Sequence, residues 1–183
     1  MDTLLNSETA LLGLLCEEPM HPYQIEKQVR FQDMRSWTEL SMSSIYKLLR
    51  KLESAGLVRS KQAIAAGRSR KTYEVSARGR KALEKKVREL LSEPQPVIWP
   101  IDIATYNIDQ VSINTAIECL RRYRSRIEDG VRCYRELEKY LRQCGCPEHR
   151  CSVAVRPQYL LKAELEWLRS LLGFLSRNRR GKQ

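Results

Sequence analysis

The chain has 183 residues, of which 42% are hydrophobic and 30% are charged, and these proportions exclude a disordered or fibrous chain. No apolar run approaches the roughly 18 residues that a membrane span needs, and the N-terminus lacks the pattern of a secretory signal, so we expect no membrane partner and a cytoplasmic location. The 33 lysines and arginines exceed the 22 acids, giving a net charge of +11, so nucleic acid is the first expected partner.

Three short helical patterns open the chain. The first follows Ser7, whose hydroxyl can cap a helix, and the second begins near Pro22, a residue favoured at the first helical position. The third follows another capping residue, Ser41, and Gly56 is placed to end it in a left-handed turn. The apolar stripe of this third helix consists of Ile45, Leu48, Leu49 and Leu52.

The hydrophobic period then changes from that of a helix to that of a strand. Residues 57–62 and 71–76 are each typical of a β-strand, and the loop between them contains Gly67. Ser76 can cap a fourth helix that ends near the proline-containing segment 94–96. The sequence therefore predicts a β-hairpin followed by one more helix.

We predict a DNA-binding domain at residues 1–92, a linker at 93–108 and a helical dimerisation domain at 109–183. Apolar residues in the last domain recur at spacings of three, four and seven, which favours two long helices packed together. Because the second of these helices is apolar over a wide arc, we expect a second copy of the chain to cover it. The predicted dimerisation residues are Ile117, Leu120, Ile127, Leu161, Leu165, Leu168 and Leu172.

The order of three helices, a two-stranded hairpin and a helix is that of a winged helix-turn-helix, whose third helix enters the major groove of DNA. The expected fold class is mainly α, with an N-terminal winged helix-turn-helix, a two-stranded β wing and a C-terminal domain of long helices. Between Ser41 and Lys71 the only acid is Glu53, so cations are concentrated where they can displace counterions together. These cations are Lys47, Arg50, Lys51, Arg59, Lys61, Arg68, Arg70 and Lys71.

Three blocks, at residues 11–25, 40–58 and 67–80, resemble the PadR-like family of transcriptional regulators. They occur in the family's order and cover about the first half of the chain. The length of the remainder resembles the longer branch of the family, which is related to virulence activators of the AphA type. The sequence departs from the family in two places, because Pro22 stands where Gly is usual and Lys47 where Pro is frequent.

The resemblance implies a sequence-specific regulator, with repression favoured over activation, that binds a pseudo-palindromic operator as a homodimer. It also implies that Tyr46 contacts a backbone phosphate and that the wing follows an adjacent groove. Ser43 and Ser44 lie where the start of the third helix can reach phosphates or bases. A core position is the alternative for Tyr46 and for Tyr73. The predicted DNA-binding residues are Tyr23, Ser43, Ser44, Tyr46, Lys47, Arg50, Lys51, Arg68, Arg70 and Lys71.

A cysteine-rich segment offers a different interpretation. Cys144, Cys146, His149 and Cys151 fall within eight residues, enough ligands for a tetrahedral zinc ion or thiols for redox sensing. Their spacing matches no standard zinc pattern, so an ordinary turn between helices is the competing interpretation, and we predict no cofactor. No phosphate-binding loop or nucleophile motif occurs, so we predict no enzymatic activity.

Two further alternatives concern partners. Winged helices also bind proteins, so a protein–protein adaptor is the competing function. Many regulators of the resembled family respond to small aromatic molecules, and the resemblance therefore implies an aromatic effector. Trp37, Trp99 and Trp167 either line its pocket or anchor the junction between the domain and the arm.

Overall fold

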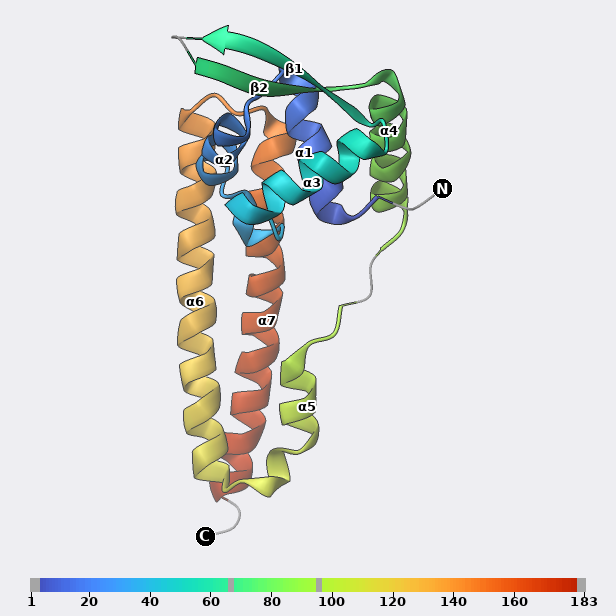
Figure 1. The fold of residues 1–183 in the computed structure, drawn as a ribbon. Coiled ribbons are helices and arrows are strands. Elements are labelled where there is room, and N and C mark those ends of the chain that lie inside the picture. Colours follow the sequence, from blue (N-terminus) through green and yellow to red (C-terminus); the bar gives the residue numbers. More distant parts are fainter. Residues whose placement is uncertain (1–3, 66–67, 95–96, 181–183) are drawn as a thin grey trace. The chain divides into compact units, whose positions relative to one another are not determined.

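The computed structural model describes residues 4–65, 68–94 and 97–180 (Figure 1). The chain divides into two compact units, Met1–Val97 and Ile98–Gln183. It is mainly helical, with a two-stranded antiparallel sheet in the first unit, which confirms the predicted fold class. Among the described residues, no helix combines the length and hydropathy that a membrane crossing requires. Side chains are not described at 36, 63–65, 68–70 and 178–180.

The described residues of the first unit form four α-helices, a short 3-10 turn and the hairpin in the predicted order. In chain order, these elements are α1 Asn6–Glu17, α2 Pro22–Phe31, η1 Met34–Ser36, α3 Met42–Ser54, β1 Val58–Ala65, β2 Arg68–Val75 and α4 Ala77–Ser92.

The start of α1 differs from the sequence prediction. The helix begins at Asn6, so Ser7 lies inside it and Leu5 is the N-cap residue. The Leu5 backbone N–H donates to the Glu8 carboxylate at 2.9 Å. An acid in the first turn, rather than the predicted serine hydroxyl, therefore satisfies this helix end.

The ends of α3 and the start of α4 follow the sequence prediction. The Ser41 hydroxyl accepts from the Ser44 N–H at 3.2 Å, and Gly56 has a positive φ of 69° just beyond the helix. The Ser76 hydroxyl accepts from the Gly79 N–H at 3.0 Å. A Cβ atom at Gly79 would lie 2.1 Å from the Leu57 carbonyl oxygen, so only glycine permits this approach of α4 to the chain before β1.

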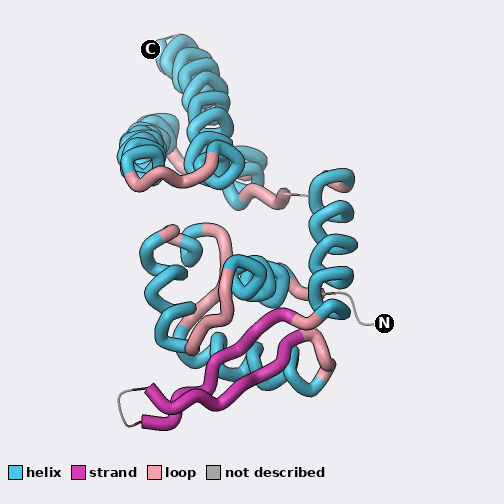
Figure 2. Tube along the Cα trace, turned by 90° about the horizontal axis from the view of Figure 1, so that it is seen from above, coloured by secondary structure: helices cyan, strands magenta, loops and turns pink. Residues whose placement is uncertain are grey.

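The hairpin is longer than predicted. Its strands pair from Val58 opposite Val75 out to Ala65 opposite Arg68, and the predicted turn residue Gly67 lies outside the described residues. Figure 2 shows both strands extending beyond the helices of the unit. The base of the hairpin is fixed to the turn between α1 and α2, because Met20 and Tyr73 exchange two backbone hydrogen bonds of 3.0 and 2.9 Å.

The core of the first unit combines the inner faces of α1, α2 and α3 with the hairpin base. Tyr73 is 5% exposed and belongs to this core, so the core alternative is correct for this tyrosine. The other buried apolar residues are Leu11, Leu12, Leu14, Leu15, Met20, Ile25, Val29, Met34, Leu40, Ile45, Leu49, Leu52 and Val58.

The second unit is built on a hairpin of two long helices, α6 Ile113–Gln143 and α7 Glu148–Arg180, which run side by side (Figure 1). A short helix, α5 Pro100–Tyr106, and the turn η2 Ile108–Gln110 precede them. The segment 93–108, predicted as a linker, therefore contains a short helix and the start of a second turn. Its apolar residues Ile101 and Ile108 pack against the α6–α7 core, and proline at the start of α5 fits a helix there.

Candidate nucleic-acid interface

One face of α3 is exposed while the opposite face is buried. Ile45, Leu49 and Leu52 are at most 1% exposed and attach the helix to the core. Tyr46 is 42% exposed, so it is a surface residue and the core alternative is wrong for it. The exposed stripe of α3, spaced by three and four residues, consists of Ser43, Tyr46, Lys47 and Arg50.

The two serines at the start of α3 have different surroundings. The Ser44 hydroxyl accepts from the Ser41 N–H at 2.6 Å and donates to the Ser41 carbonyl at 2.8 Å, so it is used in capping the helix. The Ser43 side chain is exposed, and its oxygen lies 3.1 Å from the Ser41 hydroxyl. Ser43 is therefore better placed than Ser44 to reach a ligand.

Lys51 lies at the edge of the exposed stripe and turns toward α1. Its Nζ atom is 2.7 Å from a carboxylate oxygen of Glu8, a residue that is 3% exposed. The sequence predicts Lys51 on the outer side of the helix because only its spacing is visible there. Its side chain is 59% exposed, as that spacing predicts, and it also pairs with this buried acid.

Lys71 connects the wing to α3. Its ammonium donates to the Glu53 carboxylate at 2.9 Å and lies 5.0 Å from the centre of the Tyr73 ring. Glu53 also accepts a hydrogen bond from the Ser60 hydroxyl, so both strands are attached to the same carboxylate. The hydrogen bonds from Ser60 and Lys71 lower the pKa of Glu53. We call this group of Glu53, Ser60 and Lys71 the wing clamp.

The acid at the centre of the wing clamp stands out in the sequence. Glu53 is the only acid between Ser41 and Lys71, and its position four residues after Leu49 puts it on the flank of α3 that faces the hairpin. The clamp changes the expected role of Lys71, because a cation paired with Glu53 is less available to a phosphate than an unpaired one.

The remaining predicted contacts on α2 and the wing, and the other two cations of the basic segment, differ in their surroundings. Tyr23 is 67% exposed on α2, and Arg59 is exposed on β1. Lys61 pairs with Glu74 on the neighbouring strand at 2.9 Å. The backbones of Arg68 and Arg70 belong to β2, but their side chains lie outside the described part of the chain.

A second buried carboxylate, not predicted from the sequence, fixes the path from α2 to α3. Glu26 is 5% exposed and accepts from Arg30 at 2.8 Å and from Arg35 at 2.6 Å. Arg35 also donates to the Leu40 carbonyl at 3.0 Å, immediately before the cap of α3. Burial alone raises the pKa of Glu26, but hydrogen bonds and charge from Arg30 and Arg35 lower it overall. The network therefore positions the start of α3.

The residues of the cysteine-rich segment have different surroundings. Cys144 and His149 are exposed, whereas Cys151 is fully buried with its thiol 3.6 Å from the Cys146 carbonyl oxygen. Within the described residues, no three histidine, cysteine or acidic side chains converge in a way that could hold a metal ion. This geometry gives no support to the zinc alternative.

Of the seven residues expected to dimerise, three are buried within one chain. Ile117, Leu120 and Leu168 are at most 6% exposed and pack between α6 and α7. The others, Ile127, Leu161, Leu165 and Leu172, are half-buried.

The tryptophans do not form one group in either unit. Trp37 is 46% exposed in the first unit, whereas Trp99 and Trp167 belong to the second. Trp167 packs against the α6–α7 core and Trp99 is 41% exposed. Neither unit by itself therefore contains the predicted three-tryptophan pocket.

Comparisons with known proteins agree with this architecture. Residues 11–85 match the sequence model of the transcriptional regulator PadR-like family. Bacillus subtilis PadR in complex with operator DNA has a TM-score of 0.76 and 19% identity, covering 92% of this chain and 98% of that chain. The Vibrio cholerae virulence activator AphA has a TM-score of 0.70 and 17% identity, covering 94% of this chain and 99% of that chain.

A third similar structure is that of Bacillus subtilis PadR in complex with p-coumaric acid. It has a TM-score of 0.77 and 18% identity, covering 92% of this chain and 98% of that chain. At these identities the structures establish a shared fold. No curated protein sequence matches the chain.

Proposed function

We propose that this chain is a DNA-binding transcriptional regulator of the PadR-like family, whose sequence model matches residues 11–85. In this proposal the chain binds a pseudo-palindromic operator through α3. The observation that carries the proposal is the exposed stripe of α3. It combines two cations, a tyrosine hydroxyl and a serine hydroxyl on one side of a helix whose other side is buried. A helix with one polar face exposed and the opposite face packed in the core can insert its exposed face into the major groove.

Contacts to DNA divide by chemistry. Lys47, Arg50 and the Tyr46 hydroxyl suit phosphate oxygens, which position the protein on the duplex. Ser43, at the start of α3, suits a base edge or a phosphate that faces the helix N-terminus. In this proposal the wing clamp holds the hairpin at a fixed angle to α3, and the exposed Arg59 belongs to the surface that follows the neighbouring backbone.

We propose that the chain acts as a homodimer. A palindromic operator needs two recognition helices related by a two-fold axis, and large apolar side chains are exposed in the second unit. Since Ile117, Leu120 and Leu168 are buried within the chain, the partner would contact the half-buried predicted residues and the exposed ones. Among the described residues of this unit, the exposed large apolar side chains are those of Ile98, Trp99, Ile103, Tyr106, Val111, Tyr140, Tyr159, Leu160 and Phe174.

Repression is the simplest consequence, because a dimer bound across an operator blocks access of other proteins to that DNA. A response to a small organic effector is also proposed, since the structure of Bacillus subtilis PadR with p-coumaric acid shows that a protein of this fold binds an aromatic acid. The effector would act by binding one arrangement of the dimer more tightly than another.

DNA selected by the purified protein from genomic fragments tests this function. Binding measured by fluorescence anisotropy at two salt concentrations should weaken as salt rises. Arg50→Ala should weaken binding to all sequences and reduce the salt slope by about one, whereas Ser43→Ala should change the sequence preference. Lys139→Ala, an exposed cation on α6, is the charge-matched control for Arg50→Ala. Binding without salt dependence, or equal loss in the control, would favour a protein–protein adaptor.

A further inference from the structure

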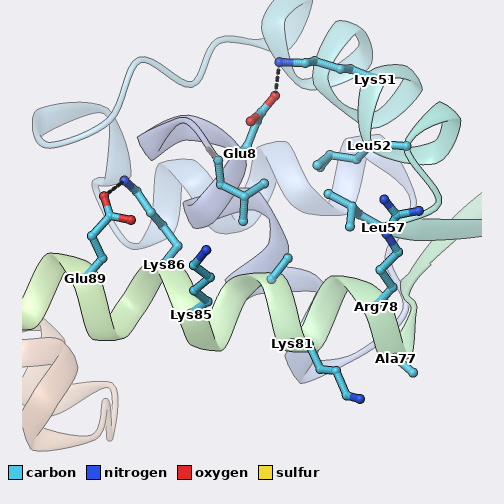
Figure 3. Close-up of a pocket in the computed structure, with 13 residues that line it drawn as sticks. Glu8, Lys51, Leu52, Leu57, Ala77, Arg78, Lys81, Lys85, Lys86 and Glu89 are labelled. Atoms are coloured by element: carbon cyan, nitrogen blue, oxygen red, sulfur yellow. Dashed lines mark hydrogen bonds and ion pairs between the residues drawn. The ribbon is translucent and has the colours of Figure 1, made fainter. Parts of the chain in front are cut away.

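A pocket within the first unit lies away from the exposed stripe of α3. It has a volume of about 840 Å³, is open to solvent on one side and is bordered by α1, the C-terminal end of α3 and α4 (Figure 3). This volume falls in the range of cavities that hold small organic molecules. Its apolar lining comes from Leu4, Leu52, Ala55, Leu57, Ala77 and Ala82.

The charged lining of this pocket is predominantly positive. Five cations and two acids surround it, so the local potential favours an anion. Both acids already have partners, because Glu8 is paired with Lys51 at 2.7 Å and Glu89 is paired with Lys86. Neither carboxylate therefore leaves an uncompensated negative charge to repel a ligand.

Two of the cations are available. Arg78 and Lys85 extend from α4 toward the pocket in Figure 3, and neither has a hydrogen bond or ion pair to another described residue. Lys81 also borders the pocket, but its ammonium points away from it. A guanidinium and an ammonium beside an apolar floor match a carboxylate attached to a hydrocarbon body.

We propose that this pocket binds a small organic anion with an apolar body, such as a monocarboxylate. Its carboxylate lies between Arg78 and Lys85, and its hydrocarbon part covers Leu52 and Leu57. The binding does not depend on the proposed function. If α3 does read DNA, the ligand contacts the last turns of that helix through Leu52 and links them to α4.

Calorimetric titration of the full chain with octanoate, without DNA, tests the proposal. We expect one octanoate per chain and binding at least about tenfold weaker in the double variant Arg78→Gln/Lys85→Gln, since each charge acts near the protein surface. The matched control is Arg135→Gln/Lys139→Gln, which removes the same two charges from the exposed surface of α6 and should bind octanoate normally. Both variants should melt like the parent chain, because all four side chains are exposed.

Two further titrations separate the contributions of charge and hydrocarbon. Octan-1-ol has the same chain without the carboxylate, and inorganic phosphate has charge without the chain. We expect each to bind at least about tenfold more weakly than octanoate, because each retains only one of the two interactions. Octanol binding as well as octanoate, phosphate competing equally with it, no octanoate binding, or equal loss in the α6 control would each overturn the proposal.

Discussion

The two units bury their apolar residues in different ways. The first has one continuous core that joins three helices to the base of the hairpin. The second has two smaller clusters along the α6–α7 hairpin, one around Leu168 and one around Cys151. Of the twelve largest fully buried side chains among the described residues, eleven belong to the first unit and only Leu168 to the second.

This difference has a physical explanation. Two helices side by side bury only one stripe each, whereas helices crossing beneath a hairpin enclose a core from several directions. The first unit can therefore bury the apolar residues of its core without a second chain. The second leaves large apolar side chains such as Ile103 and Tyr106 more than half exposed, which is where the proposed partner chain would add contacts.

The most severe test of the first unit concerns Gly79. Gly79→Ala should destabilise this unit by about 4 kcal/mol, because the new methyl group would overlap the Leu57 carbonyl, a backbone atom that cannot rotate away. Urea unfolding followed by circular dichroism measures the loss. Gly13→Ala is the control, since nothing lies within 4 Å of its added methyl, and this change should stabilise α1 by about 0.5 to 1 kcal/mol. Similar effects of both changes would show that the tight α4 approach is not required.

The corresponding test of the second unit is the truncation of Leu168, its largest fully buried side chain among the described residues. Leu168→Ala should cost the arm about 3 kcal/mol through lost transfer energy and a cavity between α6 and α7. Leu160→Ala removes the same atoms from a site that is 41% exposed and should cost less than about 1 kcal/mol. If Leu168→Ala lowers the stability of the first unit by the same amount, the two units do not unfold separately and the comparison fails.

Features that depend on neighbouring residues could be predicted from the sequence. The Ser41 and Ser76 caps, the left-handed Gly56 and the amphipathic division of α3 all follow from local chemistry, and each is correct. The start of α1 was missed because two capping solutions compete within three residues. Glu8 can reach back to the Leu5 N–H, and this bond replaces the cap predicted for Ser7.

Contacts between distant segments could not be predicted in this way. Lys51 and Lys71 both belong to the basic segment between Ser41 and Lys71. Their ion pairs with Glu8 and Glu53 depend on the folded positions of α1 and β2, which the sequence does not show. The apolar spacing along α6, which includes Ile117 and Leu120, and that along α7, which includes Leu168, likewise predict buried faces. The spacing does not show whether each face packs against the same chain or against another one. Periodicity identifies a buried face, and only the fold identifies what buries it.

A smaller loss of stability is expected from breaking the wing clamp, which joins the hairpin to α3. Glu53→Gln should cost about 1 kcal/mol at neutral pH, since the pair with Lys71 is partly exposed and therefore screened. The fold lowers the pKa of Glu53, so its stabilising effect is present above the ordinary value of 4.5 and is lost as pH falls through the lowered pKa. Urea unfolding at neutral and acidic pH should show the variant and the parent converging in acid.

The control for the wing clamp is Glu74→Gln, which breaks a pair within the hairpin at Lys61 and leaves α3 untouched. It should change stability by less than about 0.5 kcal/mol, as is usual for pairs on the surface. If Glu53→Gln behaves like this control at every pH, the hairpin is held by its base at Met20 and Tyr73 alone.

The smallest effect, and the one that isolates the second unit, concerns Tyr123. Its hydroxyl donates to Glu164 at 2.9 Å across the α6–α7 interface, and burial together with this bond raises its pKa to about 12. The folded arm therefore favours the protonated phenol, and the stabilisation is present below the ordinary value of 10.0 and lost as pH rises toward 12. Tyr123→Phe should cost less than about 1 kcal/mol at neutral pH and should remove part of the arm's alkaline destabilisation. Thermal melts between neutral pH and this alkaline range, with the 70% exposed Tyr159→Phe as control, measure it. Loss of the pH dependence in the control instead would show that exposed phenols, and not the interface, govern the alkaline stability of the arm.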